Sequence, residues 1–172
     1  MLPARRRSGR NGPHRECDER SSASSSIVHN DQTRAVRKEP ISDVMTTAVV
    51  SIDRDQPLSE AYHALHGAPY HHIPVLEGDR PVGMISSTDI LKLVYDIEGT
   101  NDRMLTSMLD HQFTIDDAMS TELVTLDQRA TVHDAAELLS DGSRHSVLVL
   151  AGDGTLAGIV TTTDLVRYLR DL

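Results

Sequence analysis

Two parts of the chain have the same pattern of apolar and polar positions. Short apolar runs at 49–52 and 123–126 predict strands. After each run, the apolar residues of 58–65 and 132–139 recur at the three- and four-residue spacing of a helix with one buried face. The second of these helices follows a Thr that has an Asp three residues later, which predicts a capping box. Each part therefore opens with a strand and an amphipathic helix.

Two further apolar runs follow each helix. They read "IPVL" and "PVGMIS" in the first part and "VLVL" and "LAGIVT" in the second, and a Gly-Asp turn separates the two runs of each pair. Apolar runs joined by such a turn predict a β-hairpin. We expect a final helix to begin at Asp89 in the first part and at Asp164 in the second. The order β-α-β-β-α therefore occurs twice.

The two parts are copies of one unit. With a shift of 74 residues, and of 75 from Gly83 onwards, residues 41–89 align with 115–164 and share 16 identities. Two copies with so long a period indicate a duplicated domain with a pseudo-two-fold axis, and not a solenoid. Neither copy is long enough to cover both faces of its own sheet. We expect an α/β fold in which two β-α-β-β-α repeats, 39–98 and 113–172, pack sheet against sheet.

The linker at 99–112 is expected to contain a short helix with one apolar side. The stripe consists of Met104, Leu105, Met108 and Leu109. Such a stripe covers the domain's own core, forms a dimer contact or binds a partner, and the first two explanations are the commoner ones.

Charge is distributed unevenly along the chain. Residues 1–38 hold nine of the 17 Lys and Arg but four of the 26 Asp and Glu, which leaves 39–172 with eight basic and 22 acidic residues, a net charge of −14. An acidic body argues against nucleic-acid binding through the folded region. The basic, Ser-rich tail at 1–38 is expected to be disordered, and a basic arm for an acidic partner is the alternative.

The chain has the features of a cytoplasmic protein. Cys17 is its single Cys, which rules out an internal disulfide and fits a reducing compartment. It has no apolar run of the roughly 18 residues that a membrane span needs, and its N-terminus lacks the apolar segment of a signal peptide. We therefore expect no association with a membrane.

Three motifs of the repeat resemble a known family. "DVMT" opens the unit, "HIPV" lies in its middle and "GMISSTD" leads into its last helix. Together they resemble the cystathionine β-synthase (CBS) domain, two of which in tandem form a Bateman module. The resemblance covers about 40–172. It implies a homodimeric regulatory module that binds AMP, ADP, ATP or S-adenosylmethionine between its repeats and signals occupancy to a regulated protein. It implies no obligatory cofactor, although Mg²⁺ can accompany a polyphosphate.

The resemblance puts the ligand where the last strand of each repeat enters the last helix. There the "GMI" run offers a wall to the base, and Asp89 or Asp164 can accept hydrogen bonds from both ribose hydroxyls. Hydroxyls near a helix N-terminus suit a phosphate. The alternative is that both Asp residues are N-caps of their helices. The candidate ligand-binding residues are Thr47, His71, His72, Pro74, Ser86, Thr88, Asp89, Thr121, Arg144, His145, Thr161, Thr163 and Asp164.

The sequence departs from the family at the phosphate end. Family members that bind AMP or ATP tightly often have an Arg just before the "hPV" strand, whereas "YHHIPV" supplies His71 and His72 here. The second copy, "RHSVLV", supplies Arg144 and His145. The two clefts need not be equivalent, and a His in place of Arg would make phosphate binding depend on pH.

Other functions are less well supported. A ligand-free scaffold with degenerate clefts is the main alternative, and the missing Arg favours it. An enzyme is not indicated, because the folded region has no Ser-His-Asp spacing, P-loop or Cys-His pair. Nor is a metal site predicted: His63 and His66 are three apart on one helix, while His71 and His72 point to opposite sides of a strand.

Overall fold

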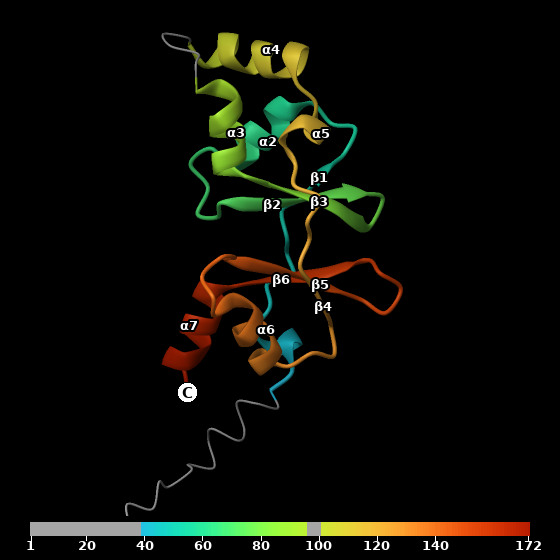
Figure 1. Ribbon diagram of the computed structural model, residues 1–172, viewed down its shortest axis with the longest axis vertical. Coiled ribbons are helices and arrows are strands. Elements are labelled where there is room, and N and C mark those ends of the chain that lie inside the picture. Colours follow the sequence, from blue (N-terminus) through green and yellow to red (C-terminus); the bar gives the residue numbers. More distant parts are fainter. Residues whose placement is uncertain (1–38, 96–100) are drawn as a thin grey trace, which may run out of the picture.

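The chain folds into two α/β halves whose sheets face each other (Figure 1). The computed structural model describes residues 39–95 and 101–172, so the predictions for 1–38 and for the start of the linker lie outside the described residues. Each half contains a three-stranded sheet, and the helices lie on the outer sides of the two sheets. The predicted α/β fold, with its two repeats packed sheet against sheet, is confirmed.

The first sheet has the strand order β1-β2-β3. In it β1 is parallel to β2, and β2 is antiparallel to β3. The elements of this half are β1 (Ile52–Asp53), α2 (Leu58–Leu65), β2 (His72–Glu77), β3 (Arg80–Ser86), α3 (Ser87–Val94) and α4 (Asp102–Gln112).

The second sheet repeats this topology as β4-β5-β6, with the same parallel and antiparallel pairs. A short 3-10 helix, η1 (Ile41–Asp43), precedes both sheets in the chain. The elements that follow α4 are α5 (Ile115–Ala118), β4 (Thr125–Asp127), α6 (Val132–Leu139), β5 (Ser146–Leu150), β6 (Leu156–Thr161) and α7 (Thr162–Arg170).

Helices, hairpins and the capping box of α6 agree with the prediction, and the first strand of each unit is present but shifted along the chain. β1 and β4 begin later than the predicted strands at 49–52 and 123–126. The residues before them cross from one half to the other, where Thr46 bridges to β6 and Ser120 bridges to β3. The last helices also begin earlier than expected, two residues before Asp89 and Asp164.

Each unit's leading segment packs on the opposite half. Ile41 of η1 is buried in the core of the second half, beside β5 and β6. Conversely, Ile115 and Ala118 of α5 are buried in the core of the first half. The structural halves are therefore not contiguous in sequence, because the two units exchange their first residues.

Backbone hydrogen bonds hold both exchanged segments in the same way. The amide of Thr46 donates to the carbonyl of Ile159 at 2.9 Å, and the amide of Ile159 donates back to Thr46 at 3.0 Å. Met84 and Ser120 form the matching pair, with both bonds at 2.9 Å. Each pair joins a leading segment to the last strand of the opposite sheet.

The duplicated Met and Gly of the motifs meet across this exchange. Met119 covers Gly83 so closely that a Cβ on Gly83 would overlap the Sδ atom of Met119. At the equivalent place, a Cβ on Gly158 would lie 2.9 Å from Met45 Sδ and 2.9 Å from the carbonyl oxygen of Thr46. These glycines are required by close packing between the two halves.

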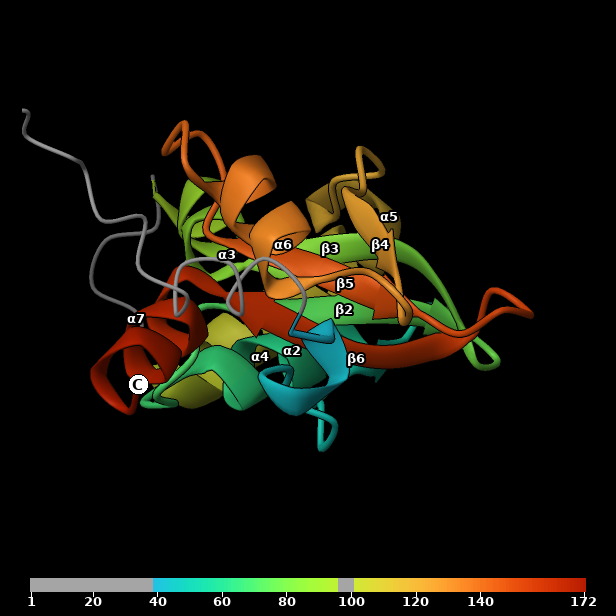
Figure 2. The ribbon, with the colours of Figure 1, turned by 90° about the horizontal axis from the view of Figure 1, so that it is seen from below.

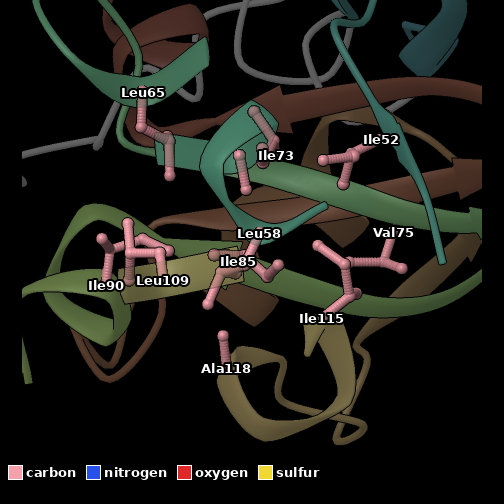
Figure 3. Packing of buried hydrophobic residues seen from close by; sticks show 11 residues of the cluster. Ile52, Leu58, Leu65, Ile73, Val75, Ile85, Ile90, Leu109, Ile115 and Ala118 are labelled. Carbon is pink, nitrogen blue, oxygen red and sulfur yellow. The ribbon is translucent and has the colours of Figure 1, made fainter. Parts of the chain in front are cut away.

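The apolar stripe of the linker mainly covers the core of the first half. Leu109 is fully buried, Leu105 packs against the same cluster, and Met104 is exposed. Figure 3 shows this core, which includes Ile52, Leu58, Leu65, Ile73, Val75, Ile85, Ile90, Leu109, Ile115 and Ala118.

Polar contacts fix α4 and α5 against this half. The carboxylate of Asp110 accepts hydrogen bonds from the amide and the hydroxyl of Ser59, both at 2.8 Å, and so caps the start of α2 from another helix. Arg54 donates two hydrogen bonds to the carboxylate of Asp116 at 2.8 and 3.0 Å. Within the described residues, no helix is long and apolar enough to cross a bilayer.

Replacing Gly158 with Ala should destabilise the fold. The new methyl group would meet Met45 and the backbone of Thr46, and such overpacking costs about 1–3 kcal/mol of unfolding free energy. Gly152→Ala is the matched control, because nothing lies within 4 Å of its added Cβ. Urea unfolding followed by circular dichroism measures both. Equal stabilities of the two variants would contradict the close contact between the halves.

Candidate functional site

A cleft of about 710 Å³ opens between the two halves. It lies where β3 and β6 lead into α3 and α7, and both hairpin turns lie at the opposite end of the sheets (Figure 2). Its lining comes from both halves and from the exchanged segment between η1 and β1. The lining residues are Thr46, Ala48, Val49, Val50, Pro69, Tyr70, His71, His72, Ser86, Thr88, His145, Ser146, Ile159, Thr161, Thr162, Thr163, Asp164 and Arg167.

The structure brings eight of the thirteen candidate residues into this cleft. They are His71, His72, Ser86, Thr88, His145, Thr161, Thr163 and Asp164. The other five, which do not line it, are Thr47, Pro74, Asp89, Thr121 and Arg144. Pro74 is fully buried within the first sheet, and Arg144 is exposed and donates to Ser143 Oγ.

Several lining residues were not among the candidates. Ala48, Val49 and Val50 form an apolar side of the cleft, and Val50 is 45% exposed. The apolar pattern had assigned two of them to a strand, so it could not identify them as cleft residues. Arg167 was also missed, although its spacing of three from Asp164 on a helix would have brought it to the same place.

Asp164 is held rigidly at the start of α7. Its Oδ2 accepts hydrogen bonds from the amide of Thr161 at 2.9 Å and from its hydroxyl at 2.7 Å. Its Oδ1 accepts from Arg167 at 3.2 Å, and the residue is 9% exposed. The interpretation of Asp164 as an N-cap is wrong, because Thr161 is the N-cap and Asp164 is the third helical residue of a capping box.

Asp89 occupies the equivalent position at the start of α3. Ser86 is the N-cap, and its amide and hydroxyl donate to Asp89 Oδ2 at 3.0 and 2.6 Å, so Asp89 is not an N-cap either. Lys92 donates to the other oxygen at 3.0 Å. Burial alone would raise the pKa of the Asp89 carboxyl, but the hydrogen bonds from Ser86 and Lys92 outweigh it and lower the pKa below its ordinary value.

Three histidines line the cleft from both halves: His71, His72 and His145. Burial lowers the pKa of the His72 imidazole, the nearby His145 and His71 lower it further, and Asp89 acts in the opposite direction. His72 is therefore mostly neutral at pH 7. Among residues 39–95 and 101–172, no group of three or more His, Cys, Asp and Glu is arranged to hold a metal ion.

A second hollow, of about 880 Å³, lies on the first half. Its carboxylates are those of Asp53, Asp55, Glu77, Asp110 and Asp116. The single guanidinium there, Arg54, is paired with Asp116. This hollow would repel an anionic ligand, so the cleft between the halves is the better candidate for a nucleotide.

Comparison with known proteins identifies the family. The family model described as "CBS domain" matches residues 41–96 and 115–171, which is more than half of the chain. The chain belongs to the CBS domain family. Its two matched regions form a tandem CBS pair, or Bateman module.

Curated relatives are distant. The CBS domain-containing protein YhcV of Bacillus subtilis is 28% identical over 127 residues, covering 73% of this chain and 81% of YhcV. The uncharacterized protein MJ1404 of Methanocaldococcus jannaschii is 25% identical over 152 residues, and the A-adding tRNA nucleotidyltransferase of Geobacter sulfurreducens is 25% identical over 127. These alignments cover 82% and 74% of this chain, but only 34% of MJ1404 and 13% of the nucleotidyltransferase.

Solved CBS structures share the fold and include ligand complexes. CBSX2 of Arabidopsis thaliana, in complex with AMP, has a TM-score of 0.64 at 21% identity, covering 78% of this chain and 98% of that chain. The CBS pair of MJ0100, with 5′-methylthioadenosine and S-adenosyl-L-methionine, has a TM-score of 0.61 at 21% identity, covering 77% and 96%. The CBS domain of a bacterial CNNM/CorC family Mg²⁺ transporter, with ATP, has a TM-score of 0.64 at 17% identity, covering 81% and 93%. At these identities the similarity establishes the fold.

Proposed function

We propose that this chain is a regulatory module that binds an adenosine-containing ligand in the cleft between its halves. The observation that supports this most is the meeting of three kinds of group there: an apolar wall, a carboxylate and several hydroxyls. The cleft volume of about 710 Å³ lies within the range typical of small-molecule sites. CBS pairs of the same fold have been solved with AMP, ATP and S-adenosyl-L-methionine.

Each part of an adenosyl ligand has a partner in the lining. The side chains of Ala48 and Val50 offer apolar surface to a flat base. In the described part of the chain, Asp164 Oδ1 accepts a hydrogen bond from Arg167 alone, so a ribose diol can share this oxygen while Oδ2 keeps the helix capped. Thr161 and Thr163 add hydroxyls beside the N-terminus of α7, where an anionic group is favoured.

Regulation would follow from the interlocked fold. A ligand in the cleft touches elements of both halves, so it stabilises the relative placement of the halves that it binds best. A partner protein that contacts both halves could detect that placement. The exchanged segment at 46–50 is the most direct link, since it lines the cleft and is hydrogen-bonded to β6.

A ligand screen tests this function. AMP, ADP, ATP, S-adenosylmethionine and NADH, each with and without Mg²⁺, should include at least one ligand that raises the melting temperature. A ligand present at a hundred times its dissociation constant stabilises the folded state by about 2.7 kcal/mol. Guanosine nucleotides at the same concentrations are the control. If none of the adenosyl compounds shifts the transition, the chain is better explained as a ligand-free scaffold.

Binding of a phosphorylated ligand should depend on pH. Because burial and the neighbouring His145 and His71 lower the pKa of His72 below its ordinary value of about 6.5, its cation forms at a lower pH than that of a free imidazole, and the cationic fraction grows as the solution becomes more acidic. Calorimetry should therefore show ATP binding more tightly at pH 5.8 than at pH 7.5, with little change for adenosine.

The matched variants are His72→Asn and His133→Asn. His133 is exposed on α6 and does not line the cleft, so its loss should leave the pH profile unchanged, whereas loss of His72 should flatten it. The terminal phosphate of ATP gains a proton over the same range, which weakens binding and opposes the expected trend. A flat profile shared by ATP and adenosine would rule out a phosphate role for the histidines.

We also propose that the module self-associates through α3 and α7. Exposed apolar side chains on or just after these two helices are Leu91, Tyr95, Val166, Leu169 and Leu172. Leu91 and Val166 are equivalent positions of the two repeats, so the apolar face is itself duplicated. Sedimentation at tens of micromolar should show a dimer, and Leu91→Glu with Val166→Glu should yield monomers. A wild-type monomer under the same conditions would contradict the proposal.

A further inference from the structure

The duplication gives each residue of the cleft a counterpart in the other repeat. The counterparts can be compared position by position, with a shift of 74 residues before Gly83 and 75 after it. Were the two sides of the module equivalent, each would offer a ligand the same wall, the same carboxylate and the same charges. They differ at the positions that bear most directly on an adenosyl ligand.

The apolar wall that would contact the base differs between the two repeats. On the side of the cleft that includes α7, the exchanged segment presents Ala48 and Val50. The equivalent positions before β4 are Glu122 and Val124. Glu122 is exposed, as is Ala48, so its carboxylate lies on the surface where the other side has a methyl group. A base packed there would remove water from this charge, and a phosphate would be repelled by it.

The carboxylate at the helix start differs as well. Asp164 lines the cleft and its side chain is 11% exposed, whereas the side chain of Asp89 is 26% exposed and does not line the cleft. Both are capping-box residues with a basic partner three positions later, Arg167 and Lys92. The two differ in what surrounds them and not in their local hydrogen bonding.

We propose that the module has one adenosyl-binding position, on the Asp164 side, and that Glu122 closes the pseudo-equivalent position to adenine nucleotides. This inference rests on the proposed function and assigns the ligand to one of the two pseudo-equivalent positions. Ala48 is then a specificity-determining residue, because the equivalent residue of the other repeat, Glu122, carries a carboxylate that excludes an adenine nucleotide.

The experiment is a calorimetric titration of the full chain with AMP and, separately, with S-adenosylmethionine. We expect one site per chain. Asp164→Asn should weaken binding about tenfold or more, because a charged hydrogen-bond acceptor is lost. Asp89→Asn is its matched control, since it removes the same charge from the equivalent capping box at the start of α3, and it should change the affinity less than threefold.

A second matched pair tests the wall. Ala48→Glu gives the Asp164 side the carboxylate of the other side and should weaken AMP binding at least tenfold. Glu122→Ala should leave the affinity of the Asp164 position within threefold and should allow a second AMP to bind at the pseudo-equivalent position. Melting temperatures of all four variants separate lost binding from lost folding. If Asp164→Asn fails to fold, Ala48→Glu still decides the matter, because Ala48 is exposed and outside every helix and strand.

The outcomes separate this inference from the function on which it rests. Two equal sites in the wild type, or equal losses in Asp164→Asn and Asp89→Asn, would overturn the single position while leaving adenosyl binding intact. Unchanged affinity in Ala48→Glu would overturn the role of the wall. No binding of either ligand to the wild type would overturn the proposed function and this inference with it.

Discussion

Each half of this protein is completed by a segment of the other, and the remaining structure depends on that exchange. The contact is tight because Met45 lies against Gly158 and Met119 lies against Gly83, with no room for a Cβ at either glycine. Two pairs of backbone hydrogen bonds fix the register of both segments against β6 and β3. Since Ile41 and Ile115 are buried in the opposite cores, separating the halves would expose apolar surface of both.

The cleft is a direct result of this arrangement. A segment that crosses between two sheets cannot also be paired in a ladder along its whole length, and so Val49 and Val50 are left to line the space beside β6. The same crossing brings the start of α7 opposite the histidines of the first half. Candidate binding groups from distant parts of the chain thus come together without a separate ligand-binding loop.

Periodicity was sufficient to predict the helices and hairpins, because burial of one face is a local property of each segment. It could not predict the exchange. Aligning the repeats shows that Met45 is equivalent to Met119, but Met45 could pack on Gly83 or on Gly158 with the same internal symmetry. That choice depends on how the halves dock, and docking is not encoded in the spacing of apolar residues.

As with the fold, part of the candidate site could be predicted from the sequence. In the sequence, the hydroxyl groups and Asp164 are recognisable as candidates because several polar residues together at the end of an apolar strand indicate a binding site. They do line the cleft. Ala48 and Val50 do not stand out, since an apolar residue near a strand reads as core. The difference between Asp164 and Asp89 was also hidden, because both sit in the same motif and only their surroundings separate them.

Hydrogen–deuterium exchange with and without saturating AMP tests the central claim most directly. If the ligand bridges the interlocked halves, protection should increase together in 46–50 and in 159–164, which are far apart in sequence but share the cleft. Protection confined to one half, or to the acidic hollow around Arg54, would contradict a binding site between the halves.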